Sequence, residues 1–208
     1  AAGHLGEREQ RISQLKSRRL SEEQRQDPAM YRCGDVVEFH QNAPGGFRRS
    51  DRAEVIEVGN DIKLRRQRDQ SVAALDTKLS SRFEVYEQHS LDIAKGEQVR
   101  ITANGRTADG KHRLTRGSIY EVRGHTRTGG LKLANGWTIG KDFGHVTHGY
   151  CVTSYSSQGR TVDHLLIAQS ADSGRASNRK QFYTSVTRGR RSVAIFTDDK
   201  QRLMQSVS

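Results

Sequence analysis

The sequence predicts an α/β chain in which two small β-barrels precede part of a parallel α/β layer. Between residues 31 and 148, short runs of β-branched and aromatic residues alternate with turn residues, which is typical of small barrels. After residue 149 the spacing becomes strand, helix, strand, as in a parallel α/β layer. Hydrophobic residues make up only 33% of the 208 residues. That share favours several small cores over a single large one.

Residues 1–29 are predicted to be helical. Three apolar residues near helical spacing, set among charged and amide side chains, predict an amphipathic helix over residues 7–25. These apolar residues are Ile12, Leu15 and Leu20. Ser21 is followed by two glutamates, so it is placed to cap a second short helix that ends before the next proline. Because the apolar stripe is narrow, we expect the longer helix to lie on the outside of a larger domain.

Residues 30–88 are predicted to form the first small barrel. Proline and glycine at 42–46, and the Gly-Asn-Asp sequence at 59–61, indicate turns between β-prone runs. The second of these turns predicts a hairpin. The expected strands are residues 36–39, 53–58, 62–64 and 82–86.

Residues 89–148 are predicted to form a second small barrel. Its turns are marked by three dipeptides that favour tight connections: Asn104-Gly105, Gly129-Gly130 and Asn135-Gly136. The expected strands are residues 97–102, 118–123, 131–133 and 137–139. Tyr120 and Trp137 are expected to fill the core of this barrel.

Residues 149–208 are predicted to form the α/β layer, with a helix over residues 177–187. The expected strands are residues 150–153, 164–168 and 193–196. A strand-helix-strand unit of this length predicts parallel pairing. Because about 60 residues make only part of such a sheet, we expect it to pack on residues outside the chain.

Charge is the strongest compositional signal. The chain has 35 Lys and Arg against 24 Asp and Glu, a net charge of +11, which is typical of nucleic-acid binding. A solvated basic surface or an acidic protein partner would also account for it. No apolar run approaches the roughly 18 residues of a membrane span, so membrane insertion is not expected. The two cysteines, Cys33 and Cys151, have no ligand spacing around them, which favours a reducing cytoplasm.

Two stretches near the C-terminus point to nucleotide chemistry. The first, residues 153–163, reads TSYSSQGRTVD, a turn of small and hydroxyl residues that lets a phosphate or nucleotide approach the backbone. The second, residues 182–191, reads FYTSVTRGRR and places Arg188 just past a predicted helix end. A guanidinium there can reach a neighbouring site with its five donors, or it can simply complement the helix dipole.

In this order and spacing, the two stretches resemble motifs V and VI of RecD-like superfamily 1B DNA helicases. The resemblance implies a partial RecA-like motor domain (2A) over residues 149–208, with Arg188 as the catalytic arginine finger that reaches the γ-phosphate. It also implies that Gln158 and Gly159 bind nucleotide together with Arg188. The DNA-binding positions that it implies in this segment are Thr153, Tyr155, Ser157 and Thr161. The family commonly has His at position 155, and this chain has Tyr.

Residues 20–43 extend the resemblance. They include LSEEQR at 20–25 and YRCGDVVEFHQNA at 31–43, and they are similar to the segment that enters the inserted barrels of conjugative relaxase-helicases of the MobF (TrwC/TraI) family. The resemblance then implies that both barrels are SH3-like insertions (2B). It also implies a bacterial cytoplasmic protein that takes part in plasmid transfer, is passed through a type IV secretion channel and binds single-stranded DNA.

A phosphate-binding loop is missing from the sequence. GRTADGKH at residues 105–112 has the glycines and the lysine of such a loop, but it ends in His and is flanked by predicted strands. We interpret it as a hairpin tip that leaves Lys111 and Arg113 available to a phosphate backbone. The chain is therefore expected to be a piece that lacks the first motor domain. ATP and Mg²⁺ are expected in the intact protein, and no cofactor and no hydrolysis are expected in this piece.

The predicted barrels carry further candidate DNA contacts, although a solvated basic face explains each of them equally well. These candidates are Arg48, Arg49, Arg65, Arg66, Arg68, Arg106, Arg116 and Arg127. His145 and His148 have the spacing of a metal pair, but without further ligands nearby no metal site is predicted.

Two alternative functions stay open. In the first, the chain is an interaction module, a translocation signal recognised by the coupling protein of a type IV secretion system. In the second, the helicase region is an inactive duplicate. The Gln158, Gly159 and Arg188 constellation argues against decay, because an unused site has no physical need for it.

Overall fold

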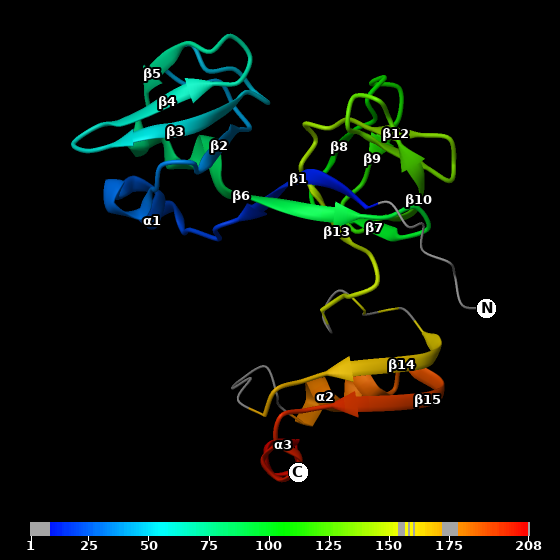
Figure 1. The fold of residues 1–208 in the computed structure, drawn as a ribbon. Helices are drawn as coiled ribbons and strands as arrows, with labels where there is room; N and C mark the ends of the chain where they lie inside the picture. Colours follow the sequence, from blue (N-terminus) through cyan, green and yellow to red (C-terminus); the bar gives the residue numbers. More distant parts are fainter. Residues whose placement is uncertain (1–8, 154–156, 158, 160, 172–178, 208) are drawn as a thin grey trace. The chain divides into compact units, whose positions relative to one another are not determined.

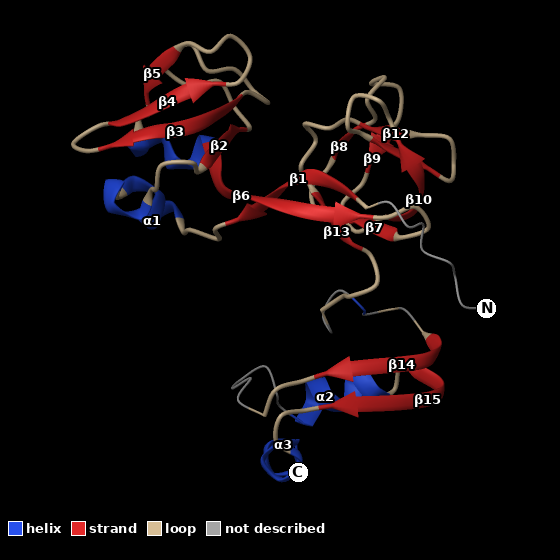
Figure 2. Ribbon diagram, viewed as in Figure 1, coloured by secondary structure: helices blue, strands red, loops and turns tan. Residues whose placement is uncertain are grey.

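The computed structural model describes residues 9–153, 157, 159, 161–171 and 179–207. The chain divides into two compact units, residues 1–150 and residues 151–208, and each is described by itself. Figure 1 traces the strands and helices along the chain, and Figure 2 shows that strands dominate the first unit. No helix among the described residues is long and apolar enough to cross a membrane.

The first unit begins with an antiparallel sheet in the order β1-β6-β2-β3-β4-β5. Its strands are β1 (Gln10–Ser17), β2 (Val36–Phe39), β3 (Arg52–Val58), β4 (Ile62–Arg66), β5 (Val72–Ala74) and β6 (Phe83–Ile93). The expected hairpin is confirmed, because β3 pairs with β4 around the turn at 59–61. One face of the sheet is buried in a core that includes Val37, Phe39, Val55, Leu64, Phe83 and Val85.

The prediction of a long N-terminal helix over residues 7–25 is wrong. Residues Gln10–Ser17 form strand β1, which pairs antiparallel with β6 from Gln10↔Ile93 to Ser17↔Tyr86. The short capped helix is confirmed as α1 (Glu22–Gln26): Ser21 accepts a hydrogen bond from the Gln24 N–H, and the Gln24 side chain accepts one from the Ser21 N–H. Two 3₁₀ helices complete this part, η1 (Pro28–Met30) and η2 (Thr77–Arg82).

A second antiparallel sheet follows in the order β12-β11-β10-β7-β13. Its strands are β7 (Gln98–Ile101), β10 (Ile119–His125), β11 (Leu131–Leu133), β12 (Thr138–Ile139) and β13 (Val146–His148). A separate hairpin is made of β8 (Gly105–Arg106) and β9 (Arg113–Leu114). Tyr120 and Trp137 pack against the core of this sheet as expected, both partly buried.

The closed barrels expected from the sequence are not observed. Among the described residues of the first unit, the two larger sheets are open and are joined by the β1/β6 ribbon. Strand β6 pairs with β2 through Phe83–Tyr86 and with β1 through Tyr86–Ile93. Leu91 and Ile93 then enter the core of the second sheet, together with Ile12 of β1. The expected boundary between residues 88 and 89 therefore falls inside one continuous strand.

The second unit contains a parallel pair of strands, as predicted. Strand β14 (Val162–Ala168) pairs in parallel with β15 (Gly189–Phe196), and helix α2 (Arg179–Val186) lies between them in sequence. Helix α3 (Lys200–Val207), which was not predicted, follows and buries Leu203. The strand expected at residues 150–153 is not observed. Leu166 is 72% exposed and Phe196 is 60% exposed, so one face of the pair stays open within the described residues.

Candidate nucleotide-facing and nucleic-acid-binding residues

The parallel pair brings the end of the first predicted stretch against Arg188. The Val162 N–H donates a hydrogen bond to the Arg188 carbonyl oxygen at 2.9 Å, and Val162 is in register with Gly189. These residues are 26 positions apart in the sequence, and the strand-helix-strand connection returns the chain to the same end of the sheet. The two stretches that the sequence singles out therefore meet within one unit.

Arg188 sits in the turn that leads from α2 into β15. Its N–H donates to the Ser185 carbonyl oxygen at 3.1 Å, which closes the last helical turn. The next residue, Gly189, must be glycine, because a Cβ there would lie 2.6 Å from Val193 Cγ2 and 2.9 Å from the Ser192 carbonyl oxygen. The chain thus enters β15 immediately after Arg188, with no room for a bulkier residue.

The Arg188 side chain is half-buried, and its Nε is fully buried and has no hydrogen-bond partner among the described residues. A buried donor left unpaired costs free energy of about 1–3 kcal/mol, so such a group favours the arrival of an acceptor. Guanidinium groups bind phosphate and carboxylate oxygens with short, charge-assisted hydrogen bonds. The side chain is therefore chemically suited to an anionic ligand.

The described residues of the first stretch lie on the surface or near it. Thr153 and Thr161 are exposed, and Ser157 is half-buried with its N–H bonded to the Thr153 carbonyl oxygen at 3.0 Å. Gly159 has a φ of +78° and nothing within 4 Å of an added Cβ, so the backbone there is open to an approaching group. Two of the predicted site residues fall outside the described residues: Tyr155 and Gln158.

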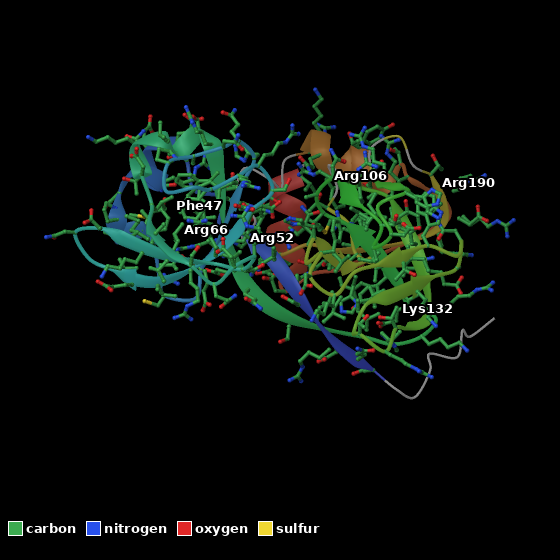
Figure 3. All side chains as sticks on the ribbon, turned by 90° about the horizontal axis from the view of Figure 1, so that it is seen from above. Phe47, Arg52, Arg66, Arg106, Lys132 and Arg190 are labelled. Carbon is green, nitrogen blue, oxygen red and sulfur yellow. The ribbon has the colours of Figure 1, made fainter. Side chains whose placement is uncertain are left out.

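The arginines that follow Arg188 have a carboxylate partner. Arg190 Nε lies 3.4 Å from Asp163 Oδ1, and Arg191 Nε lies 3.8 Å from Asp163 Oδ2. All three side chains are well exposed, so these pairs contribute little to stability. The three arginines therefore differ in their surroundings. Arg190, which is labelled in Figure 3, and Arg191 pair with Asp163, whereas Arg188 presents a buried donor.

The segment at 105–112 is the tip of the β8–β9 hairpin, as predicted, and not a loop that leads into a helix. The Asp109 carboxylate accepts hydrogen bonds from the Thr107 hydroxyl and the Lys111 N–H, and the Thr107 bond in particular lowers the pKa of Asp109. The Arg106 guanidinium, labelled in Figure 3, donates to a carbonyl oxygen at the tip. Lys111 and Arg113 are exposed on this fixed turn.

Two of the predicted DNA contacts are held within the first sheet. The Arg66 side chain donates to the Gly45 carbonyl oxygen, lies 5.0 Å from the centroid of the Phe47 ring and is paired with Asp69 at 3.4 Å. Arg68 pairs with Asp51 at 3.5 Å and with Asp69 at 3.2 Å. The other candidates are exposed and make no side-chain hydrogen bond or ion pair in the part of the chain that the structure describes: Arg48, Arg49, Arg65, Lys111, Arg113, Arg116 and Arg127.

A partly buried polar cluster between the two sheets was not predicted. Glu38 Oε2 accepts hydrogen bonds from Arg52 Nε at 2.9 Å and from His145 Nε2 at 2.8 Å. Arg52 also donates to the carbonyl oxygens of Asp142 and Phe143. The residues of this polar cluster are up to 107 positions apart in the sequence. No local sequence signal connects residues that far apart.

The histidine pair does not act as a unit. His145 faces Glu38, whereas His148 Nδ1 lies 3.8 Å from a carboxylate oxygen of Glu97. Within the described ranges, no group of three or more His, Cys, Asp or Glu side chains is arranged to hold a metal ion.

Comparison with known proteins gives limited similarity. No protein-family model matches the chain, and no curated protein matches it. A crystal structure of Bacteroides Pif1 bound to ssDNA is similar over 97% of this chain and 38% of that one, with 15% identity and a TM-score of 0.23. Pif1 helicase from Bacteroides in complex with ADP-AlF3 and ssDNA is similar over 97% of this chain and 37% of that one, with 14% identity and a TM-score of 0.24. The chain thus spans well under half the length of these helicases.

Proposed function

We propose that this chain is part of the ATP-dependent DNA helicase region of a conjugative relaxase. In this proposal it binds single-stranded DNA and supplies Arg188 to a nucleotide held by a first motor domain elsewhere in the protein. We further propose that residues 149–208 are RecA-like and that residues 30–148 are a DNA-binding insertion.

One observation carries the proposal: the bond between the Val162 N–H and the Arg188 carbonyl oxygen, which joins the two motif-bearing stretches. A motor of this type needs a DNA-facing turn and a nucleotide-facing arginine in one rigid element, so that nucleotide binding and DNA binding influence each other. The parallel β14–β15 pair supplies that element, and the unpaired Arg188 Nε supplies a donor suited to phosphate.

The chemistry assigned to Arg188 is electrostatic. Mg-ATP, when bound by a first motor domain, would supply the phosphoryl group to be transferred. Arg188 would then place positive charge against the phosphate oxygens as negative charge develops on them. The open backbone at Gly159 would face the nucleotide together with Arg188, and the hydroxyls of Thr153, Ser157 and Thr161 would contact the DNA strand.

Mutating Arg188 in the complete protein tests the proposal. Arg188→Ala should lower DNA-stimulated ATP hydrolysis by on the order of 10³-fold or more, because an arginine finger contributes that much. Arg188→Lys should restore little of the rate, since an ammonium lacks the planar fork of donors. Arg191→Ala is the matched control, because Arg191 is 73% exposed and pairs with Asp163. Wild-type hydrolysis by Arg188→Ala would overturn the proposal.

A further inference from the structure

Two loops of the first sheet lie at the same end of its strands and carry several arginines. The loop at residues 40–51 joins β2 to β3, and the turn at residues 67–71 joins β4 to β5. Three arginines connect these loops to each other and to the sheet: Arg66 donates to the Gly45 carbonyl oxygen, Arg68 pairs with Asp51 at 3.5 Å, and Arg82 donates to the Asn42 carbonyl oxygen at 2.8 Å. We call this surface the basic edge; its arginines are Arg48, Arg49, Arg66, Arg68 and Arg82.

The longer loop is held firmly by its middle residue. The Phe47 side chain is 2% exposed and stacks on Phe39, with ring centroids 4.4 Å apart and an angle of 11° between the rings. The Arg66 guanidinium covers the Phe47 ring, and Figure 3 labels both residues. A side chain at Gly46 would come within 3.3 Å of that guanidinium. The loop is therefore packed from inside by an aromatic ring and a cation.

This packing leaves two arginines pointing to solvent from a fixed backbone. The Arg48 N–H donates to the Asp51 carboxylate, and the Arg49 N–H donates to the Asn42 side-chain oxygen, both at 2.9 Å. Both side chains are exposed and make no hydrogen bond or ion pair among the residues described. Because the backbone is already ordered, a ligand that pairs with these guanidinium groups would order only their side chains.

The carboxylates at the basic edge are already engaged. Asp51 accepts from the Arg48 N–H and pairs with Arg68. Asp69 accepts from the Ser71 hydroxyl, and hydrogen bonding by Ser71 lowers the pKa of Asp69 to about 2, so the carboxylate remains ionised at neutral pH. Among the described residues, these carboxylates therefore hold the loops in place and do not pair with the side chains of Arg48 and Arg49. A polyanion that binds from outside would supply the missing negative charge.

We infer that the basic edge binds the phosphodiester backbone of single-stranded nucleic acid through Arg48 and Arg49, without contacting the bases. The inference rests on the proposed function for the choice of a single strand. The absence of base contacts follows from the loops themselves: their one Phe, Tyr or Trp is Phe47, which is buried under Arg66. The exposed His40 ring is already held by the Ser81 carbonyl oxygen at 2.8 Å. With no exposed Phe, Tyr or Trp ring on which bases can stack, we infer that recognition depends on charge.

Fluorescence anisotropy across a salt series, with the 208-residue chain, tests the inference. The probes are a labelled oligothymidine, an abasic phosphodiester oligomer of equal length, and a duplex. We expect the oligothymidine and the abasic oligomer to bind the wild-type chain with the same salt slope. Arg48→Ala/Arg49→Ala should reduce that slope by about 1.4 and weaken binding roughly 25-fold at about 0.1 M salt, because each single-strand phosphate contact contributes about 0.7 to the slope.

Two control variants isolate the edge from net charge. Arg11→Ala/Lys95→Ala removes the same charge from exposed positions outside the two loops, and its slope should match that of the wild-type chain to within about 0.3. Arg48→Lys/Arg49→Lys keeps the charge and should keep most of the slope. An unfolding transition equal to that of the wild-type chain confirms that each variant is folded.

The outcomes separate the inference from the proposed function. No binding by the wild-type chain to any single strand would overturn both. Binding that is unchanged in Arg48→Ala/Arg49→Ala, or lost equally in the Arg11/Lys95 control, would overturn the inference and leave the helicase proposal standing. Much weaker binding to the abasic oligomer would show that bases are contacted and would also overturn it. Tighter binding of the duplex than of the oligothymidine would overturn the single strand as the ligand of the basic edge.

Discussion

Glu38 contributes to the junction of the two sheets through its hydrogen bonds to Arg52 and His145. Burial by itself raises the pKa of this carboxyl, but the hydrogen bond from His145 and the charge of Arg52 outweigh burial, so its pKa lies below the ordinary value of 4.5. A carboxyl with a lowered folded-state pKa stabilises the fold fully above its unfolded-state pKa. That contribution is lost as the pH falls below 4.5, toward the folded-state value.

Glu38→Gln should therefore lower the free energy of unfolding by about 1–3 kcal/mol near neutral pH, because the charge-assisted bonds to Arg52 and His145 are weakened. The variant should also lose less stability than the wild-type chain when the pH is lowered through 4.5. Urea denaturation at a series of pH values measures both effects. Glu57→Gln is the control, since Glu57 forms an exposed pair with Lys63 and should cost less than about 0.5 kcal/mol. Equal effects of the two substitutions would contradict this role of Glu38.

Gly130, which precedes β11, and Gly110, at the tip of the β8–β9 hairpin, require glycine for different reasons. A Cβ at Gly130 would lie 2.4 Å from the Ile139 carbonyl oxygen, which belongs to a neighbouring strand and cannot move aside cheaply. A Cβ at Gly110 meets nothing within 4 Å, and only the φ of +71° disfavours a side chain there.

Gly130→Ala should accordingly destabilise the chain by about 2 kcal/mol or more, whereas Gly110→Ala should cost about 1 kcal/mol. Thermal unfolding followed by circular dichroism would rank the two. A larger loss in Gly110→Ala would show that backbone conformation, and not the approach of the strands, decides the cost.

At the scale of elements, β1 shows where prediction from the sequence fails. Ile12 and Leu15 are three positions apart, which suggests a helix, yet both are buried in a strand. Because side chains alternate along a strand, residues three positions apart lie on opposite faces. Ile12 packs into the core of the second sheet, whereas Leu15 lies on the other face, and its N–H donates to the Gly144 carbonyl oxygen. The partner of β1 is β6, about 80 residues away, so pairing with a distant strand overrides the local pattern.

Ile12→Ala should destabilise the chain by about 2–4 kcal/mol, because it removes a side chain packed between β6 and the second core. Val72→Ala is the comparison: Val72 is 53% exposed on the edge strand β5, and its truncation should cost less than about 1 kcal/mol. Chemical denaturation compares the two directly. A small effect of Ile12→Ala would mean that the β1/β6 ribbon contributes little to the fold.

Elements with a local cause were predictable. The β3–β4 hairpin follows from its Gly-Asn-Asp turn, and α1 follows from the capping box of Ser21 and Gln24. The parallel pairing of β14 with β15 follows from strand-helix-strand spacing. The absence of closure into barrels was not predictable, because closure depends on which distant strands meet. In the candidate site the approach of Val162 to Arg188 was predictable from the motif order, but the Glu38 cluster was not.

At the scale of the whole molecule, the two units differ in how they are stabilised. The first has two buried cores, whereas the second rests on two parallel strands with Leu166, Phe196 and Tyr183 largely exposed. A two-stranded sheet with an uncovered apolar face is marginally stable in water. Further strands or helices that covered this face would therefore stabilise the second unit.

Hydrogen exchange of the 208-residue chain should reveal this difference. Amides of β14 and β15 should exchange at least about 100-fold faster than those of β2 and β6, because regions with few buried contacts open more readily. Peptide-resolved mass spectrometry measures both sets in one sample. Equal protection of the two units would contradict the lower stability expected for the second unit.

We propose that the surplus positive charge of the chain serves to bind single-stranded DNA. Titration of a labelled oligothymidine with the wild-type chain, repeated from about 50 to 300 mM salt, tests this proposal. We expect binding at low salt whose log affinity falls linearly with log salt. Absence of binding at the lowest salt, or an affinity that does not change with salt, would contradict it.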